Sequence, residues 1–439
     1  MTLNPVAIDF DPQGNVYIAE GWRMGKGAAA IVHGPMVRSN SLPLDLQRKT
    51  IEERAEHVES LIEGGFFERD YFTGRADLLR LVKDTDGDDI ADESSVFAGG
   101  FNDKLDGVAS GVLYLDGKVL FACVPHLWRL EDKDGDGDAD QQTEGERTSL
   151  SYGYGLRWGY GGHDLHGLIK GPDGRIYFTM GDRGYNIETQ EGERLIGTDV
   201  GSVFRMWPDG SGLEIYATGL RNPQELAFDN YGNLFTGDNN SDGGDLARFC
   251  YVPEGSDAGW RQDVQSIPSR GPWNREHMWE PRFEKSDPAQ PAWIMPPLAN
   301  VGRGPSGIAH YPGTGDVFPT HGSFLMCDYP AGVRHVLVKP DGASFKVVED
   351  SKLPTASESI SDVAWGYDGR LYLSDWGGGW GPNDKHGHLK VMVNEAAHAE
   401  QAGLIAEVEE LFASGFETAS DETLFELLGH ADQRVRTAA

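Results

Sequence analysis

The chain has 439 residues and a formal net charge of −32 at pH 7. Such a charge argues against nucleic acid and anionic lipid as partners, because both require a basic protein surface. No apolar run reaches the roughly 18 residues needed to span a bilayer, so we expect no transmembrane segment. The 58 glycines and 23 prolines are typical of many short strands joined by tight turns.

The chain enters a strand-like segment almost at its first residue, over residues 5–8, and no signal peptide precedes it. We interpret it as a protein whose signal peptide has been removed, and we expect a periplasmic or extracellular location. The cysteines, Cys123, Cys250 and Cys327, form neither a CxxC motif nor a haem-attachment site. We interpret them as buried structural thiols.

A hairpin signature recurs six times along the chain. In each copy apolar and polar residues alternate, a Gly-containing turn pair interrupts them, and the alternation resumes, which indicates a β-hairpin. The copies are AIDFDPQGNVYIAE from Ala7, GVLYLDGKVLFAC from Gly111, GLIKGPDGRIYFTMGD from Gly167, LAFDNYGNLFTGD from Leu226, GIAHYPGTGDVF from Gly307 and VAWGYDGRLYLSDW from Val363. They predict an all-β fold, a six-bladed β-propeller, over residues 1–394.

Two segments have helical periodicity instead. Ile51, Val58 and Ile62 recur at helical spacing, which predicts a helical insertion in the first blade over about residues 41–65. Residues 395–439 contain further amphipathic patterns, and their ending LGHADQRVRTAA resembles the opening of a HEAT repeat. We expect a short C-terminal α-helical segment there, the start of a HEAT-like array.

Two acidic loops resemble calcium-binding loops. Their carboxylates stand at positions one, three, five and nine: Asp84, Asp86, Asp88 and Asp92 in the first loop, and Asp132, Asp134, Asp136 and Asp140 in the second. Alternating carboxylates on a tight loop can converge on Ca²⁺, although neither loop has the glutamate at position twelve of an EF-hand. Both follow similar phrases, LLRLVKDTDGD and LWRLEDKDGDGD, so we expect them on equivalent hairpins of adjacent blades. The hypothesis is a structural calcium site, and the alternative is an acidic turn without metal.

The segment ATGLRNPQELAFD from Ala217, followed by GDNNSD from Gly237, carries the strongest functional signal. It resembles the G-x-R-N-P-x-G-L-A segment of soluble glucose and aldose-sugar dehydrogenases that use pyrroloquinoline quinone (PQQ). The resemblance implies that Arg221 and Asn222 contact the cofactor. It also implies that Asp238 and Asn239 belong to a loop that holds Ca²⁺ through backbone carbonyls. A polyanionic quinone suits a fixed guanidinium and a divalent ion.

A second stretch, GHDLHGLIKGPDGRIYFTMGDRG from Gly162, resembles the same family. There a histidine before a G-P-D-G hairpin acts as general base, and imidazole suits that role because its pKa lies near working pH. The resemblance implies that His163 or His166 is the base. Spacing favours His163, and the choice stays open. For either residue the alternative is a histidine that only bonds backbone groups at the propeller centre.

Over about residues 4–394 the chain resembles the family of PVC-group (Planctomycetes and relatives) dehydrogenases described as membrane-bound. The segments that carry this resemblance are GHDLHG, GLRNPQELAFD, GDNNSDGGD, GPSGIAHYPGTG and LYLSDWGGGWG. Members carry such a propeller, then HEAT repeats and often a c-type haem domain. The resemblance therefore implies a c-type haem domain or cytochrome as electron acceptor.

The sequence departs from the glucose dehydrogenases on the later blades. Their basic residues clamp the quinone, but residues 304–311 contain neither Lys nor Arg. Arg334 and His335 are the candidates to replace them.

The motifs favour a PQQ-dependent oxidoreductase of a sugar or related alcohol, with hydride transfer to the quinone. The missing clamps favour a non-redox alternative, either a carbohydrate-binding module or a metal-dependent lactonase-like hydrolase. A hydrolase needs several carboxylates converging on one ion in the channel, whereas a quinone site needs an arginine beside a carbonyl-lined Ca²⁺. Trp376 and Trp380 are candidates to line a sugar-binding mouth or, alternatively, to pack between blades.

Overall fold

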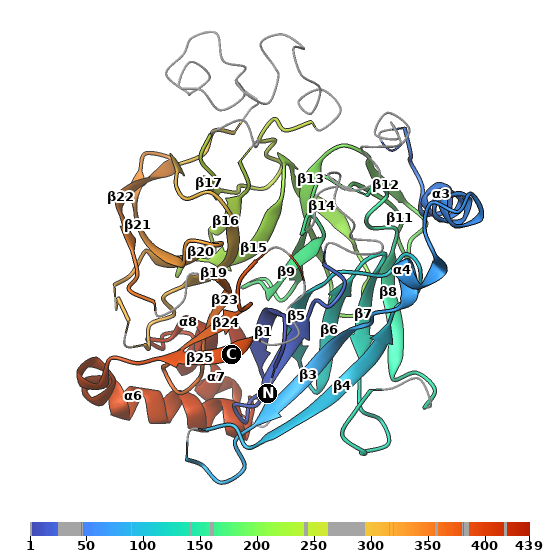
Figure 1. Ribbon diagram of the computed structural model, residues 1–439. Helices are drawn as coiled ribbons and strands as arrows, with labels where there is room; N and C mark the ends of the chain where they lie inside the picture. The colour runs from blue at the N-terminus through green and yellow to red at the C-terminus, as the bar shows by residue number, and fades with distance from the viewer. Residues whose placement is uncertain are drawn as a thin grey trace.

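The computed structural model shows six blades, each a sheet of three or four strands, arranged around a common axis (Figure 1). It describes the whole chain except residues 1, 25–44, 46, 89, 140–142, 159–161, 241–244, 262–294, 316, 319, 356–358, 380, 382–385 and 417–418. The predicted six-bladed β-propeller is confirmed. The three cysteines are buried thiols, as the sequence predicts.

Each blade is an antiparallel sheet whose first strand lies innermost. Blades 1 and 2 comprise β1 (Pro5–Phe10), β2 (Val16–Glu20), β3 (Asp77–Lys83) and β4 (Glu93–Phe101), then β5 (Ala109–Leu115), β6 (Lys118–Cys123), β7 (His126–Leu130) and β8 (Arg147–Tyr152). Blade 3 comprises β9 (Leu165–Lys170), β10 (Ile176–Met180), β13 (Gly201–Met206) and β14 (Glu214–Leu220), with a hairpin of β11 (Tyr185–Glu188) and β12 (Arg194–Gly197) inserted. Blades 4 and 5 comprise β15 (Pro223–Phe228), β16 (Leu234–Asp238), β17 (Arg248–Tyr251) and β18 (Ala299–Asn300), then β19 (Pro305–His310), β20 (Ser323–Asp328), β21 (Val333–Asp341) and β22 (Ser344–Lys352). Blade 6 comprises β23 (Ile360–Trp365), β24 (Leu371–Asp375) and β25 (His388–Met392).

The turn between the first two strands is built by an aspartate and a glycine. Asp11 and Asp229 each accept two backbone N–H groups of their own turn at 2.9 Å. Gly14 and Gly232 stand in these turns with φ of +83° and +80°, which costs a glycine little. The residues that form such a turn lie within the repeated hairpin signature itself. Each blade can therefore form its turn independently of the others.

Contacts between the inner strands of neighbouring blades close the ring. The first and last blades are each built from one stretch of the chain. The backbone N–H of Ile8 in β1 donates to the Asp362 carboxylate in β23 at 2.8 Å. Between blades 4 and 5 the N–H of Ile308 donates to the Glu225 carboxylate at 3.1 Å. Aromatic packing fills the space between blades, as where Phe235 meets Phe324 with ring centroids 4.7 Å apart.

The helical insertion predicted for the first blade lies between β2 and β3. Helix α3 (Ile51–Glu63) begins with a capping box of Thr50 and Glu53, and a short helix α4 (Arg69–Thr73) follows it. The apolar face of α3 buries Val58 in a cluster with Trp158. This packing places the insertion at the rim of the propeller (Figure 1).

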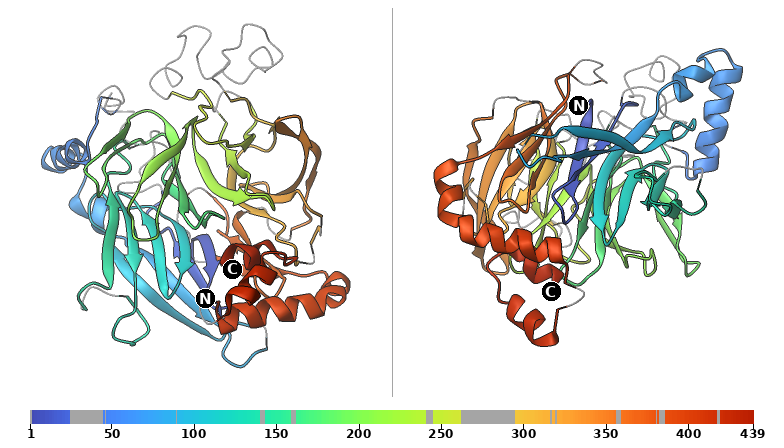
Figure 2. Two further views of the ribbon diagram at one scale, coloured as in Figure 1. Left: turned by 180° about the vertical axis from the view of Figure 1, so that it is seen from behind. Right: turned by 90° about the horizontal axis from the view of Figure 1, so that it is seen from below.

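Among the described residues, three helices follow the last strand: α6 (Glu395–Ser414), α7 (Asp421–Leu427) and α8 (Gln433–Ala438). Phe412 of α6 stacks on Tyr367 of blade 6 with centroids 4.0 Å apart. Gln433 of α8 donates to the carbonyl of Phe228 in blade 4 at 3.2 Å. These helices and α3 lie on opposite faces of the propeller (Figure 2). In the described part of the chain, no helix is both long and apolar enough to cross a membrane.

Candidate active site

A buried histidine–aspartate pair lies where blade 3 meets blade 4. His163 precedes the inner strand β9, Asp182 follows β10, and pairing of these strands brings the two residues to the same end of the hairpin. The Nδ1 atom of His163 lies 2.6 Å from Oδ1 of Asp182. Trp260 donates its indole N–H to Oδ2 of the same carboxylate at 2.9 Å. Asp182 is thus held by partners on both oxygens.

The charges around Asp182 decide its protonation. Burial alone would raise the pKa of this carboxyl, but the charge and hydrogen bond of His163, the charge of Arg221 and the indole N–H together hold it below its usual value. An ionised Asp182 accepts the Nδ1–H of the imidazole. The Nε2 atom, which lies 3.4 Å from the side-chain amide nitrogen of Asn239, is then the atom that can take up a proton.

The imidazole of His166 lies among backbone carbonyl groups. Its Nε2 lies 2.6 Å from the carbonyl of Gly162, and its Nδ1 lies 3.1 Å from the carbonyl of Ser110. Burial lowers the pKa of His166 to about 4. Both ring nitrogens therefore meet backbone oxygens, whereas His163 has its Nε2 on the side of Asn239.

The Arg221–Asn222 segment is anchored through its backbone. The N–H groups of Arg221 and Asn222 donate to the Asp238 carboxylate at 3.1 and 2.7 Å. Asp238 also forms a buried ion pair with Arg248. The Arg221 guanidinium donates to the carbonyl of Asn240. The structure therefore brings the predicted cofactor residues and the predicted loop of Asp238 and Asn239 together beside His163.

The side chain of Asn222 has unsatisfied hydrogen-bonding capacity. It is 1% exposed, and neither its amide nitrogen nor its oxygen has a hydrogen-bond partner in the part of the chain that the structure describes. Such a buried group costs about 1–3 kcal/mol unless a ligand or water completes it. A Cβ at Gly181 would lie 2.8 Å from the Asn222 oxygen and from the His163 backbone, so this glycine keeps the space between them open. The guanidinium and carboxamide donors, with an imidazole beside them, fit an anionic quinone such as PQQ.

Arg334 does not join this group of residues. Its guanidinium pairs with Asp350 at 2.8 Å and lies 3.6 Å from Asp328, and all three residues belong to blade 5. Its neighbour His335 stacks on Phe318 with centroids 4.1 Å apart. The structure therefore leaves Arg334 and His335 apart from His163 and Arg221.

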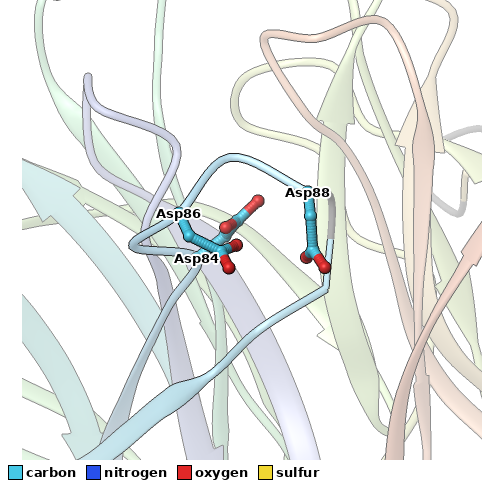
Figure 3. A group of neighbouring side chains, drawn as sticks. All are labelled: Asp84, Asp86 and Asp88. Atoms are coloured by element: carbon cyan, nitrogen blue, oxygen red, sulfur yellow. The ribbon is translucent and has the colours of Figure 1, made fainter.

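The two acidic loops lie on equivalent hairpins of adjacent blades, between β3 and β4 and between β7 and β8, as the sequence predicts. In the first loop, Asp84, Asp86 and Asp88 bring one ligand atom each within 4.8 Å of the others (Figure 3). The second loop does the same with Asp132, Asp134 and Asp136. Among the described residues, only these two loops bring together three ligand atoms of His, Cys, Asp or Glu in this way.

The remaining predicted ligands differ between the loops. Asp92 accepts a hydrogen bond from the Thr85 hydroxyl at 2.8 Å and stands outside the group of three. Asp140 lies outside the described residues, as does Trp380. Trp376 is buried, at 4% exposure.

Asp182 and Trp260 belong to this group of residues but are not among the site residues predicted from the sequence. Asp182 is the second residue of the G-D-x-G segment at residues 181–184, but its contact with His163 joins residues that are 19 apart in the chain. Trp260 lies 78 residues after Asp182, in a segment without repeat character. No local pattern connects the two.

The fold is a six-bladed propeller, and its structural neighbours include a PQQ-bound sugar dehydrogenase. The PQQ-bound aldose sugar dehydrogenase of Streptomyces coelicolor matches with a TM-score of 0.51 and 16% identity, covering 89% of this chain and 95% of that chain. The PQQ domain of pyranose dehydrogenase from Coprinopsis cinerea matches with a TM-score of 0.49 and 11% identity, covering 89% and 93% of the two chains. At these identities the likeness shows the fold alone.

In sequence, residues 1–379 match the family described as "Domain of unknown function (DUF7133)", and the chain belongs to that family. No curated protein matches the sequence significantly.

Proposed function

We propose that the protein is a PQQ-dependent oxidoreductase that oxidises a sugar or a related alcohol. The observation that carries the proposal is the buried His163–Asp182 pair beside Arg221 and the unsatisfied amide of Asn222. When bound, PQQ supplies a two-electron acceptor to which the substrate carbon can transfer hydride. The chain itself supplies binding, orientation and proton transfer.

Each residue of the site has one task in this proposal. The Arg221 guanidinium binds a carboxylate of the cofactor, and the Asn222 amide completes its hydrogen bonds on the same ligand. His163 accepts the proton of the substrate hydroxyl at Nε2. Asp182 fixes the imidazole tautomer through Nδ1 and stabilises the imidazolium that forms. His166, with carbonyl oxygens at both ring nitrogens, is assigned a structural role.

Two kinds of calcium site belong to the proposal, one near the cofactor and one on each exposed acidic loop. The loop of Asp238 and Asn239 would hold a Ca²⁺ beside the quinone through backbone carbonyls, as its resemblance to the glucose dehydrogenases implies. The two groups of three aspartates on the exposed loops would hold structural Ca²⁺, since hard cations prefer such oxygen donors.

The electron acceptor and the location follow from the resemblance to the PVC-group dehydrogenases. We infer a c-type haem domain or cytochrome as the acceptor, and a periplasmic or extracellular setting. Mixing the PQQ-loaded, substrate-reduced protein with an oxidised c-type cytochrome tests the acceptor, because haem reduction is directly visible in absorbance.

The lactonase-like alternative lacks support from the site. Such a hydrolase needs several carboxylates around one ion in the channel. The groups of three carboxylates found among the described residues lie on the exposed loops instead. Of the two tryptophans proposed to line a sugar-binding mouth, Trp376 is buried and Trp380 lies outside the described residues.

Titration of the protein with PQQ in the presence of Ca²⁺, followed by quinone absorbance and then by dye reduction with a panel of sugars, tests the proposal. Arg221→Ala should weaken PQQ binding by about tenfold or more, as expected for a charge-assisted bond worth about 1.5–3 kcal/mol. His163→Gln should keep binding and lose turnover by about 100-fold or more.

Arg334→Ala is the matched control, because it removes an arginine that pairs with Asp328 and Asp350 of its own blade. It should leave PQQ affinity within about twofold. Absence of PQQ binding at any calcium concentration would contradict the proposal.

A further inference from the structure

The segment that carries Trp260 is fixed against the Arg221 motif. Residues 256–260 run alongside the end of β14, where the N–H of Thr218 donates to Ser256 at 2.9 Å and the N–H of Ala258 donates back to Thr218 at 3.0 Å. The N–H of Trp260 itself donates to the carbonyl of Gly219 at 2.8 Å. The backbone of Trp260 therefore has a defined position relative to Arg221, two residues after Gly219.

Gly219 permits this close approach. It has a φ of +79°, and a Cβ at this position would lie 2.5 Å from the nitrogens of Ala258 and Gly259 and would collide with the Asp257 carboxylate. A glycine in the G-L-R-N motif thus has a packing reason, which is to admit the segment that brings in Trp260.

The Trp260 side chain contacts both halves of the proposed site. Its indole N–H donates to Oδ2 of Asp182 at 2.9 Å, opposite the oxygen that meets His163. The Arg221 guanidinium lies over the face of the same ring, 5.3 Å from its centroid. The residue is 1% exposed, so both interactions operate away from bulk water.

We propose that Trp260 is a positioning residue that holds the Asp182 carboxylate toward the base and the Arg221 guanidinium toward the anionic cofactor. The inference rests on the proposed function for its catalytic consequence. The contacts themselves are independent of that function.

The two halves of the indole have separable effects. The N–H prevents the carboxylate from turning away from His163 and stabilises its negative charge. The ring face restricts the guanidinium through a cation–π contact. Trp260→Phe removes the N–H and keeps a ring, whereas Trp260→Leu removes both.

Trp158 provides a matched control. It is also buried, at 2% exposure, and it also lies beneath an arginine, with the Arg54 guanidinium 5.9 Å from its ring. Its indole nitrogen, however, has no hydrogen-bond partner in the part of the chain that the structure describes. Trp158→Phe therefore makes the same chemical change in a similar environment without breaking a link to Asp182.

The first measurement is the proton NMR spectrum of the full chain without cofactor. The His163 Nδ1–H bonded to Asp182 should give a far-downfield imidazole signal, assigned by its loss in His163→Gln. Trp260→Phe should shift or broaden this signal, and Trp158→Phe should leave it unchanged. An unchanged signal in Trp260→Phe would overturn the link between the indole and the base. This readout needs no PQQ, so its outcome is separate from the fate of the proposed function.

The second measurement separates turnover from cofactor affinity in the loaded enzyme. Trp260→Phe should lower kcat by about tenfold through misplacement of the base, with the Kd for PQQ within about threefold. Trp260→Leu should in addition raise that Kd by about three- to tenfold. If both variants changed only the melting temperature, as expected for Trp158→Phe, Trp260 would be a packing residue and the proposal would be wrong.

Discussion

Blades 3 and 5 use equivalent carboxylates in different ways. Asp328, at the end of the second strand of blade 5, accepts the backbone N–H groups of Arg303 and Gly304 and pairs with Arg334 of the third strand. Asp182, just past the second strand of blade 3, meets a histidine and a tryptophan. The position in the repeat is shared, and the partners decide whether the carboxylate anchors a blade or holds a histidine side chain.

Other blades follow the pattern of blade 5. Each pairs the acid at the end of its second strand with a basic residue of its third strand: Glu20 with Arg80, Asp238 with Arg248, and Asp375 with Lys390. In blade 3 the third strand places Ser202 opposite Met180, two residues before Asp182, whereas blades 1 and 5 have Arg80 and Arg334 at that register. The absence of a basic residue there leaves Asp182 to the imidazole and the indole.

The largest expected effect comes from substituting Asp182 and, for comparison, the equivalent Asp328 by asparagine. Asp182→Asn should lower kcat by about 10³-fold, because a neutral amide neither fixes the imidazole tautomer nor stabilises the imidazolium. Asp328→Asn should leave kcat within about threefold and instead lower the free energy of unfolding by about 2 kcal/mol. Steady-state kinetics and urea unfolding of both variants make the test. Equal losses of turnover would erase the distinction between the blades.

Calcium should stabilise the fold by binding to the two acidic loops. At a free concentration 100 times its Kd, an ion bound to one site stabilises the fold by about 2.7 kcal/mol. Both oxygens of Asp132 accept backbone N–H groups, those of Gly135 and Gly137, which fixes this carboxylate in the second loop. Asp86→Asn and Asp134→Asn should each reduce the calcium-dependent rise in melting temperature. No rise on adding Ca²⁺ to chelated protein would favour the acidic turn without metal.

The carboxylates between inner strands should respond to pH in the opposite direction from Asp182. Burial raises the pKa of Asp9 to about 7 and that of Asp362 to about 6, and it raises that of Glu225 well above its usual value with help from the charge of Asp362. The folded state thus favours the protonated forms, so their contribution is complete below about pH 4 and is lost as pH rises through 6 and 7. Stability should fall by about 2 kcal/mol between pH 5 and pH 8.

Urea unfolding across that pH range measures the effect. Asp362→Asn, which is neutral at every pH, should flatten the curve. A stability that rises between pH 5 and pH 8 would contradict the assignment of protonated carboxyls to the ring.

The smallest effect is expected at Arg334. Its pair with Asp350 is partly exposed, so Arg334→Ala should cost about 1 kcal/mol or less in the free energy of unfolding and change neither kcat nor PQQ affinity beyond about twofold. A loss of PQQ binding in this variant would restore Arg334 as a cofactor clamp and place the site differently.

The sequence predicted the fold because each blade repeats local chemistry. The aspartate and glycine of turns such as Asp11–Gly14 build a hairpin from neighbouring residues, and six copies specify six blades. His163 and Arg221 could be proposed from the sequence, because each stands in a short motif that resembles a known family. The contacts of Asp182 and Trp260 could be identified only from the structure, because their partners are remote in the chain.

Arg334 illustrates a different limit. Its register matches that of Arg80, but the insertion in blade 1 separates Arg80 from Glu20 by 60 residues and hides the repeat. Read alone, an arginine on a later blade resembled a missing cofactor clamp. Aligned by strand, it is the basic partner of its blade's terminal acid.

The most direct test is a crystal structure of the protein with PQQ and Ca²⁺. We expect the quinone at the junction of blades 3 and 4, with a carboxylate on the Arg221 guanidinium and the Asn222 amide hydrogen-bonded to the ligand. The His163 Nε2 atom should face the space left for substrate. A quinone bound beside Arg334 in blade 5, or no quinone at the junction at saturating concentration, would contradict the account.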